Sequence, residues 1–263
     1  MNAPVLSLSG VSRHFGALKA VDDVTIDVPD GARHALIGPN GAGKSTLFKL
    51  VTGSMRVSSG TVSLGGTDVT RLSEPQRARR GISQTLQHSS LFLSQTVQQN
   101  VLLAAQRQYR TRHSLVPRRQ AAARERASGL LADVGLEGRA GTPVSALSHG
   151  ERRQVEVAVA LACEPRLLLL DEPAAGMSPA ESTRLVGLLR SLPASVTVVI
   201  VEHDLDVVFA LATSVTVLHL GRVLLTGSPD DVRASAAVQE AYLGTGRASL
   251  FLDTAEPAHL EVS

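Results

Sequence analysis

The sequence predicts an α/β fold in which a largely parallel sheet is interrupted by a helical subdomain. Short runs rich in branched apolar residues recur along the chain, and helical segments lie between several of them. Alternation of this kind is typical of parallel sheets covered by helices. The stretch from about residue 97 to residue 162 instead reads as helix almost throughout, which favours an inserted helical unit.

Continuous apolar runs indicate the strands. Leu167–Leu170 and Thr197–Val201 lack polar alternation, as strands buried on both faces do. The other expected strands are Val24–Val28, Ala35–Ile37, Thr61–Leu64, Val215–Leu218 and Val223–Leu225.

Helices are expected between these strands and in the inserted unit. In the segment His149–Ala162, apolar residues recur at i, i+3, i+4 and i+7 from Val155, which predicts one apolar stripe. The other expected helices are Lys44–Val51, Val97–Gln108, Arg118–Val134, Pro179–Leu192 and Leu205–Leu211.

These elements predict one domain over residues 1–244, with an α/β core at about 1–87 and 164–244. The helical subdomain is expected at about 88–163, and residues 245–263 are expected to form a loosely held tail. A length of 263 residues with 43% hydrophobic content suits this organisation.

Charge and cysteine content exclude some functions. A net charge of +2 is too mild to imply nucleic-acid binding, so no nucleic-acid partner is expected. Arginines cluster between residues 107 and 126, either as a solvated helix face or as a contact with a membrane or acidic partner. Cys163 is the only cysteine, which excludes an internal disulfide and fits the cytosol. No signal segment or membrane-length apolar run is present, so another chain is expected to cross any membrane served.

A phosphate-binding loop is predicted between the strand ending at Ile37 and the helix starting at Lys44. Gly38, Gly43, Lys44 and Ser45 have the spacing of such loops. Glycines let backbone N–H groups converge on a phosphate, Lys44 reaches the β and γ phosphates, and the Ser45 hydroxyl ligates Mg²⁺. The alternative is a glycine-rich turn with an incidental lysine. The predicted ATP contacts are Gly38, Pro39, Asn40, Gly41, Ala42, Gly43, Lys44, Ser45 and Thr46.

Two carboxylates follow the leucine strand. Asp171 emerges at its carboxyl end, where α/β sheets place ligands, and is predicted to hold Mg²⁺ largely through coordinated water. Glu172 is predicted to orient the attacking water. The alternative is an exposed Asp-Glu pair at a strand end.

The stretch around Ser148 opens like a helix but carries a glycine in its first turn. Ser148 and Glu151 have the spacing of a capping box. Gly150 would cost about 1 kcal/mol there relative to alanine. The stretch is therefore either an ordinary helix cap or a first turn with little side-chain bulk, which would let an anion approach the helix start.

Together, the phosphate loop, Asp171-Glu172 and Leu147–Glu151 resemble the ATP-binding cassette (ABC) ATPases, whose signature reads Leu-Ser-Gly-Gly-Gln. The resemblance covers about residues 4–244. It implies a phosphate-loop core with an antiparallel N-terminal β portion and a helical subdomain. It also implies that two cassettes face head to tail, each ATP lying between one phosphate loop and the other signature. Ser148, His149, Gly150 and Glu151 would then contact the partner's ATP, which requires Ser148 and the Gly150 N–H to stay uncrowded.

The resemblance gives roles to further residues. Phe15 matches the aromatic that stacks on adenine, the alternative being an ordinary core residue. Gln87 matches the Q-loop, which contacts Mg²⁺ and water and couples to the membrane partner; the alternative is a surface glutamine. His203 matches the switch histidine at the γ-phosphate, against an ordinary histidine after a strand. The predicted catalytic residues are Glu172, His203 and Lys44, and the predicted metal contacts are Ser45, Gln87 and Asp171.

Two positions depart from the family pattern. Glu151 replaces the usual glutamine, and we hypothesise that it caps the ATP-free helix and slightly opposes closure of the dimer. Ser178 stands where aspartate is common, which leaves its part in contact between cassettes open.

Among importers, cassettes for branched-chain amino acids are the most similar. The resemblance rests on Ala20–Val24, Ile37–Phe48, Asp171–Gly176, Glu202–Asp204 and Ala241–Gly244. It implies a cytoplasmic ATPase on the inner face of the membrane, with a second cassette (the same or a different chain), two permease subunits and a solute-binding protein. Urea, amides and other amino acids stay open as solutes.

Two alternatives are weighed. A lipopolysaccharide-export cassette shares Gly150–Arg153 and a similar closing Tyr-Leu-Gly, and neighbouring permease genes would distinguish it. A soluble ABC ATPase of translation or repair is less favoured, because the chain has one phosphate loop and no sustained heptads.

Overall fold

The computed structural model describes residues 4–85, 91–108 and 117–243. Its central sheet has six strands in the order β10-β9-β3-β8-β7-β6, and all neighbours are parallel except β10 and β9. The predicted, largely parallel sheet is therefore confirmed. The strands are β3 (Arg33–Ile37), β6 (Ile82–Gln84), β7 (Leu167–Asp171), β8 (Thr197–Val201), β9 (Ser214–His219) and β10 (Arg222–Gly227).

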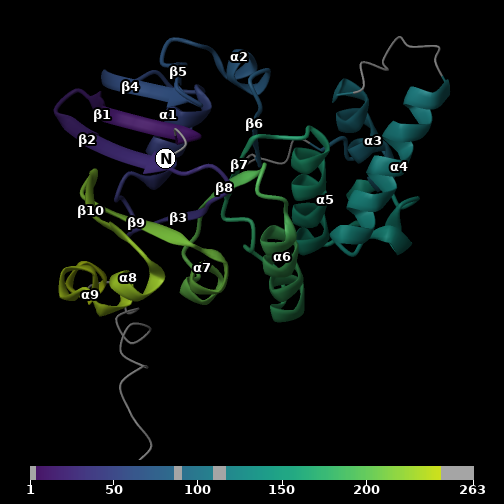
Figure 1. Cartoon of the computed structure of the whole chain (residues 1–263). Helices are drawn as coiled ribbons and strands as arrows, with labels where there is room; N and C mark the ends of the chain where they lie inside the picture. Colours follow the sequence, from purple (N-terminus) through teal and green to yellow (C-terminus); the bar gives the residue numbers. More distant parts are fainter. Residues whose placement is uncertain (1–3, 86–90, 109–116, 244–263) are drawn as a thin grey trace, which may run out of the picture.

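A second sheet covers the N-terminal side of the molecule (Figure 1). Its four strands are antiparallel in the order β2-β1-β4-β5, which confirms the antiparallel N-terminal β portion. Two of the predicted strands belong here rather than to the central sheet. The strands are β1 (Leu6–Phe15), β2 (Leu18–Val28), β4 (Ser59–Leu64) and β5 (Thr67–Asp68).

Helix α1 (Lys44–Thr52) contributes to the core between the two sheets. Its buried side chains Leu47, Phe48 and Leu50 pack in one apolar cluster with residues of both sheets. This packing fixes the start of the helix, where the glycine-rich loop enters it.

The helical subdomain consists of α3 (Val97–Gln108), α4 (Pro117–Asp133) and α5 (His149–Ala162), which contact one another at one end of the molecule (Figure 1). Short 3₁₀ turns at Glu137–Arg139 and Val144–Ala146 connect α4 to α5. The predicted stripe on α5 is confirmed: Val155, Ala158 and Ala162 are fully buried and Val159 packs against the same cluster. Arg110 and Arg112 of the arginine cluster and the whole predicted tail lie outside the described residues, and the predicted domain bounds stay a prediction.

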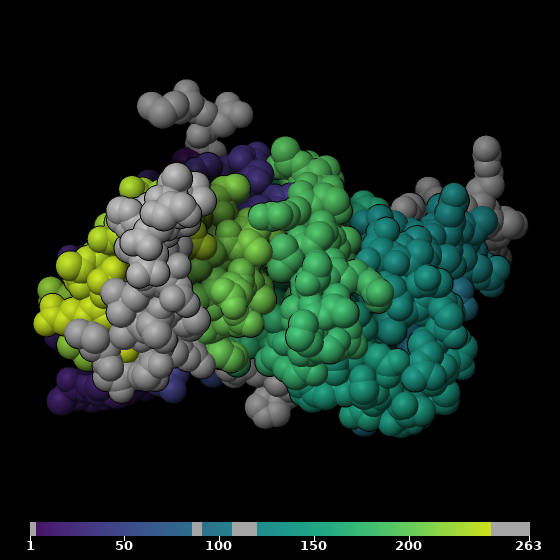
Figure 2. Space-filling view, turned by 90° about the horizontal axis from the view of Figure 1, so that it is seen from below, coloured from purple at the N-terminus to yellow at the C-terminus, as the bar shows by residue number. Residues whose placement is uncertain are grey.

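The remaining helices are α2 (Glu74–Ala78), α6 (Pro179–Ser191), α7 (Leu205–Leu211), α8 (Pro229–Ala234) and α9 (Ala236–Leu243). Helix α6 ends before Leu192, because a residue preceding proline disfavours helical geometry. Seen from below, α6 lies between the helical subdomain in teal and the C-terminal helices in yellow (Figure 2). In the part of the chain described, every helix is too short or too polar to cross a bilayer.

Candidate functional site

The loop between β3 and α1 depends on glycine at three places. Gly38, Gly41 and Gly43 have φ angles of +150°, +79° and +102°, a region that L side chains rarely adopt. A Cβ at Gly43 would lie 2.5 Å from the Ala20 carbonyl oxygen, and one at Gly38 would collide with the Leu218 carbonyl. Gly41 has open space around it, so its requirement is conformational alone.

Helix α1 starts without a side-chain cap. Its N-cap is Gly43, and its first turn contains no acidic residue. The Lys44 ammonium donates hydrogen bonds to the carbonyl oxygens of Gly38 (2.7 Å) and Pro39 (3.0 Å), which folds the side chain back over the loop. The helix therefore presents its positive end and a lysine to a hollow of about 490 Å³.

This hollow joins the loop to the carboxylates. Residues 40–46 line one part of it, and Glu172, Leu18 and Leu220 line others. Its volume falls in the usual range of ligand pockets. The structure thus brings the predicted phosphate loop and Glu172 together around one space.

Asp171 is the last residue of β7 and is 4% exposed. Burial raises the pKa of its carboxyl, and neighbouring Glu172 adds to the rise, while Arg153, Lys49 and Lys44 oppose it. A buried carboxylate at the end of a strand is suited to receive a cation, which would offset the cost of burying its charge.

Glu172 follows with a φ of +47°, which is unusual for a residue with a long side chain. Its backbone N–H donates to the Val201 carbonyl at 2.8 Å, so the strained turn is tied to the end of β8. The carboxylate is 46% exposed and lines the hollow.

His203, two residues after the end of β8, lies beside Glu172. Its Nδ1 is 3.5 Å from Glu172 Oε1. Beneath it, Glu202 is 1% exposed and accepts hydrogen bonds from the backbone N–H groups of Ala174 (2.9 Å) and His203 (3.1 Å). Burial raises the pKa of Glu202, and the two backbone donors oppose the rise.

Glu202 has no role among the residues predicted from the sequence. Its signal was present, because a carboxylate directly follows the apolar run Thr197–Val201, as Asp171 follows Leu167–Leu170. Its hydrogen bonds connect the end of β8 to the segment after Glu172 and so hold the two strand ends together.

The capping box at the start of α5 is confirmed. The Ser148 N–H donates to Glu151 Oε2 at 2.8 Å, and the Glu151 N–H donates to Ser148 Oγ at 3.1 Å. Arg139 Nε lies 3.0 Å from Glu151 Oε1. The Ser148 N–H, followed by Arg139, holds the pKa of Glu151 below its usual range.

Gly150 packs closely against a neighbouring segment on its Cα side, and the expectation that its N–H stays open to a partner's phosphate stays a prediction. Gly150 is buried, and a Cβ there would lie 3.2 Å from Glu181 Oε2 and 3.3 Å from the Gly176 carbonyl oxygen. The segment leading into α6 packs against this turn, which gives the glycine a packing reason. Ser148 and His149 are exposed, as a contact with another molecule requires.

Ser178 has a local role of its own. It is the N-cap of α6: its N–H donates to Glu181 Oε2 at 2.7 Å, and its hydroxyl accepts from the Glu181 N–H at 3.4 Å. The serine therefore caps a helix beside Gly150.

Arg153, which the sequence analysis also left without a role, connects α5 to the carboxylate pair. Its guanidinium donates to the carbonyl oxygens of Asp171 (2.7 Å) and Glu172 (3.2 Å), and it pairs with Glu156 at 2.6 Å. Backbone carbonyls leave no trace in a sequence, so no motif could have shown this contact.

Phe15 is 44% exposed at the end of β1, which excludes the ordinary core interpretation. The Arg13 guanidinium lies over its ring, 4.7 Å from the centroid. Gln87 lies outside the described residues. Three positions earlier, Gln84 ends β6 and donates to Glu74 Oε1 at 2.6 Å.

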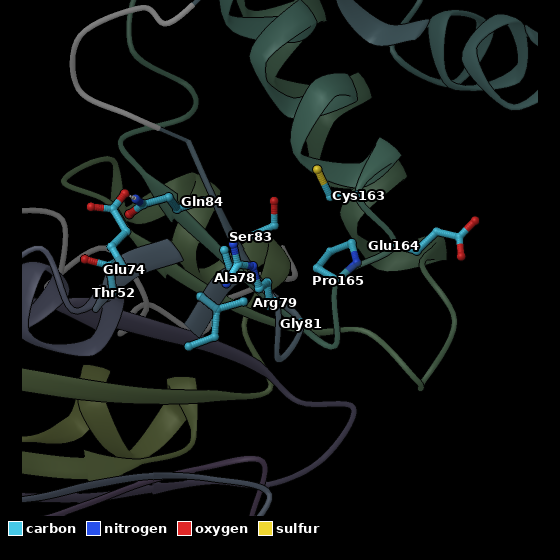
Figure 3. Close-up of a pocket in the computed structure, with 11 residues that line it drawn as sticks. Thr52, Glu74, Ala78, Arg79, Gly81, Ser83, Gln84, Cys163, Glu164 and Pro165 are labelled. Carbon is cyan, nitrogen blue, oxygen red and sulfur yellow. Dashed lines mark hydrogen bonds between the residues drawn. The ribbon is translucent and has the colours of Figure 1, made fainter. Parts of the chain in front are cut away.

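A groove of about 470 Å³ lies beside Gln84. Figure 3 shows Glu74 and Gln84 on one side of it and Cys163, Glu164 and Pro165 on the other. The groove therefore connects α2 and β6 with the segment that follows α5.

A metal ion at this site would take only some of its ligands from the protein and the others from phosphate oxygens and water. Within the residues described, no cluster of three or more histidine, cysteine or acidic side chains could hold a metal. Ser45 and Asp171 offer one hydroxyl and one carboxylate. This donor set fits Mg²⁺, which commonly takes one or two carboxylates together with phosphate oxygens and water.

Two family models match the chain. The model described as ABC transporter matches residues 21–175, and the model described as branched-chain amino acid ATP-binding cassette transporter matches residues 222–248.

Known proteins give the same result. The high-affinity branched-chain amino acid transport ATP-binding protein LivG of Salmonella typhimurium strain LT2 is 35% identical over 93% of this chain and 99% of its own length. The corresponding protein BraF of Pseudomonas aeruginosa is 34% identical over the same shares. Among solved structures, the ADP conformation of MJ1267, an ATP-binding cassette of an ABC transporter, superposes with a TM-score of 0.79 at 27% identity. That alignment covers 91% of this chain and 98% of the other.

Proposed function

The chain belongs to the ABC transporter family of ATP-binding cassettes, and from that premise we propose that it powers the import of branched-chain or closely related amino acids. Cassettes of this family are ATPases that drive transport. One observation carries the choice of solute. The similarity to LivG and BraF runs along almost the whole chain and includes a C-terminal segment, residues 222–248, that matches the branched-chain model.

The proposed nucleotide site is the hollow between the phosphate loop and Glu172. Backbone N–H groups among residues 40–46 hold the triphosphate in this proposal, and the uncapped start of α1 adds its dipole. Lys44 exchanges its two carbonyl partners for the β and γ phosphates. The exposed ring of Phe15 offers a face on which adenine stacks.

Hydrolysis is proposed to use Glu172 and His203. Glu172 orients the attacking water and accepts its proton, and His203, whose Nδ1 is 3.5 Å from that carboxylate, contacts the γ-phosphate. Bound Mg²⁺ would supply charge neutralisation at the β and γ phosphates. Ser45, Asp171 and Gln87 are the residues proposed to hold it.

A second cassette is proposed to complete each site. Ser148 and His149 are exposed at the start of α5, where a helix dipole favours an anion. With Gly150 and Glu151, they are placed to meet ATP bound by the partner, whether a copy of this chain or a different cassette. Closure around ATP would pull on the permeases.

The groove in Figure 3 is the proposed docking site for a permease. Gln84 on its wall lies three residues before Gln87, so a contact in the groove acts directly on the Q-loop segment. Two permeases and a solute-binding protein would complete the importer and place this chain at the cytoplasmic face of the membrane.

Reconstitution tests the proposal. The chain is purified with the membrane proteins that accompany it, placed in vesicles and supplied with the binding protein. We expect leucine, isoleucine or valine to stimulate ATP hydrolysis and to be taken up. The control is the Glu172→Gln variant, which should assemble but take up nothing. Absence of accompanying permeases, or stimulation by urea or amides alone, would refute the assignment.

A further inference from the structure

The turn between β9 and β10 has an unexpected residue at its tip. Leu220 and Gly221 form a two-residue loop between the paired residues His219 and Arg222, with φ angles of +49° and +80°. Two positive φ angles are typical of type I′ hairpin turns, which favour Asn-Gly. Leucine at the first position is strained, because its Cβ is crowded in the left-handed region.

Leu220 is also one of the most exposed apolar side chains in the structure, at 76%. Asparagine would suit both the positive φ and the exposure of this position, so leucine offers no advantage for folding. Such an outlier points to a role in contact with something else.

The turn is fixed against the phosphate loop. The Gly221 N–H donates to the Ala42 carbonyl at 3.1 Å, and the Asp22 N–H donates to the Gly221 carbonyl at 2.8 Å. Arg222 closes the arrangement with an ion pair to Asp22, at 2.9 Å from Nε. These bonds hold Leu220 at the wall of the hollow that the phosphate loop lines.

Leu18 lines the same hollow and is 65% exposed. In the described part of the chain, these two are the exposed large apolar side chains that border it. Polar backbone and Lys44 occupy the loop side, and Leu18 and Leu220 add apolar side chains to the lining. Lys19 also lines the hollow, and its ammonium is paired with Asp22 at 3.3 Å.

We propose that Leu220, together with Leu18, forms an apolar wall for the base and sugar of the nucleotide whose phosphates the loop holds. This inference rests on the proposed function, because it takes the loop to bind ATP. Leucine offers no hydrogen bond, so the wall favours a nucleoside over a bare phosphate chain. The hydrogen bonds of the turn fix the backbone of Leu220 beside the hollow before nucleotide arrives.

The Leu220→Asn variant tests this wall. Asparagine tolerates the left-handed turn, so the midpoint of thermal unfolding should stay equal or rise. Calorimetric titration should show ATP binding weakened about 3- to 10-fold, as expected for loss of part of a buried leucine contact. Binding of inorganic tripolyphosphate, which has no nucleoside, should not change. The matched control is Leu224→Asn, an exposed leucine on β10 outside the hollow, which should leave both affinities unchanged.

Three results would overturn the inference. Equal weakening of ATP and tripolyphosphate would mean that the substitution disturbs the loop. Unchanged ATP binding would show that Leu220 does not contact the nucleoside. If ATP-driven pairing of cassettes were lost at the same time, Leu220 would instead belong to the contact between copies. A parent protein that binds neither probe would instead refute the proposed nucleotide site itself.

Discussion

In the proposed mechanism, two helices present their N-terminal ends to a phosphate, and these two ends are built in opposite ways. Helix α1 begins at Gly43 with no side-chain cap and no acid in its first turn. Helix α5 begins at Ser148 with a complete capping box, and its acid, Glu151, is paired with Arg139. The first start has no side-chain cap, whereas the capping box of the second satisfies the N–H groups of Ser148 and Glu151 within the chain.

The difference in capping corresponds to the stage at which each helix would bind its anion. In the proposed mechanism, α1 binds ATP within one chain, so an open start can be filled whenever nucleotide is present. Helix α5 receives phosphate only when a second cassette docks. Until then an uncapped start would cost stability, and the capping box stabilises the helix in the unpaired chain.

The largest effect is expected from a substitution that abolishes hydrolysis and leaves the N-terminal ends of α1 and α5 intact. Substituting Glu172→Gln should lower ATP hydrolysis by about 10²- to 10⁴-fold, the usual contribution of a positioned base. ATP binding should persist, and a nucleotide-bound pair of chains should accumulate. Phosphate release and size-exclusion chromatography measure the two outcomes. Hydrolysis at the parental rate would show that Glu172 is not the base.

The open start should be sensitive to bulk in a graded way. Gly43→Ala places a Cβ 2.5 Å from the Ala20 carbonyl and should lower the free energy of unfolding by about 2–4 kcal/mol. Gly41→Ala meets no atom within 4 Å, so only its positive φ is strained and the loss should be about 1 kcal/mol. Urea denaturation of both variants checks this order. Equal losses would contradict the steric argument.

The capped start should lose stability when its cap is removed. Ser148→Ala leaves the Glu151 N–H without its side-chain acceptor and should lower the free energy of unfolding by about 1 kcal/mol. The comparison control is Ser45→Ala in the first turn of α1, where the serine is not a cap, and a much smaller loss is expected. Similar losses of unfolding free energy in both variants would contradict the distinction between a capped α5 and an uncapped α1.

Glu151 links the cap to pairing of cassettes. Its negative charge lies at the helix start that the partner's γ-phosphate must approach, so Glu151→Gln should strengthen ATP-driven pairing by about 2- to 5-fold. Glutamine can still form a capping box, which keeps the helix intact. Analytical ultracentrifugation with ATP, in the Glu172→Gln background, measures the change. No gain in affinity would refute the hypothesis that Glu151 opposes closure.

The smallest expected effect is a dependence on pH. The pKa of Glu151 is held below its ordinary value of 4.5, first by the Ser148 N–H and then by Arg139. A carboxyl with a lowered pKa stabilises the fold above 4.5, and this contribution is lost as the pH falls through the lowered pKa. The stability difference between the parent and Glu151→Gln should therefore be constant at neutral pH and shrink below about pH 4.5. A difference that stays level down to pH 3 would contradict the charge-based account.

Sequence patterns predicted the parts of the molecule whose cause is local. The buried strands, the apolar stripe on α5 and the capping box at Ser148 all follow from short-range spacing. Strand β1 was not predicted, because irregular pairing with β2 between Leu8 and His14 breaks its alternation. Helices α8 and α9 are too short to show a clear period.

The candidate site divides in the same way. The phosphate loop and the Asp171-Glu172 pair could be located from motifs, since their residue types and spacing determine their chemistry. The crowding at Gly150 could not, because Glu181 reaches it from another helix. Arg153 reaches its backbone carbonyls only when α5 packs against β7, and Glu202 reaches the Ala174 N–H only when β7 and β8 pair.

Arg153 has a consequence for how the two ATPs of a closed pair are consumed. It fastens the helix that would sense the neighbour's nucleotide to the strand end that would hold the metal and water of its own. Departure of phosphate from one interface would therefore loosen the opposite one. The two ATP sites of the pair should therefore release phosphate in alternation or together, and not independently of each other.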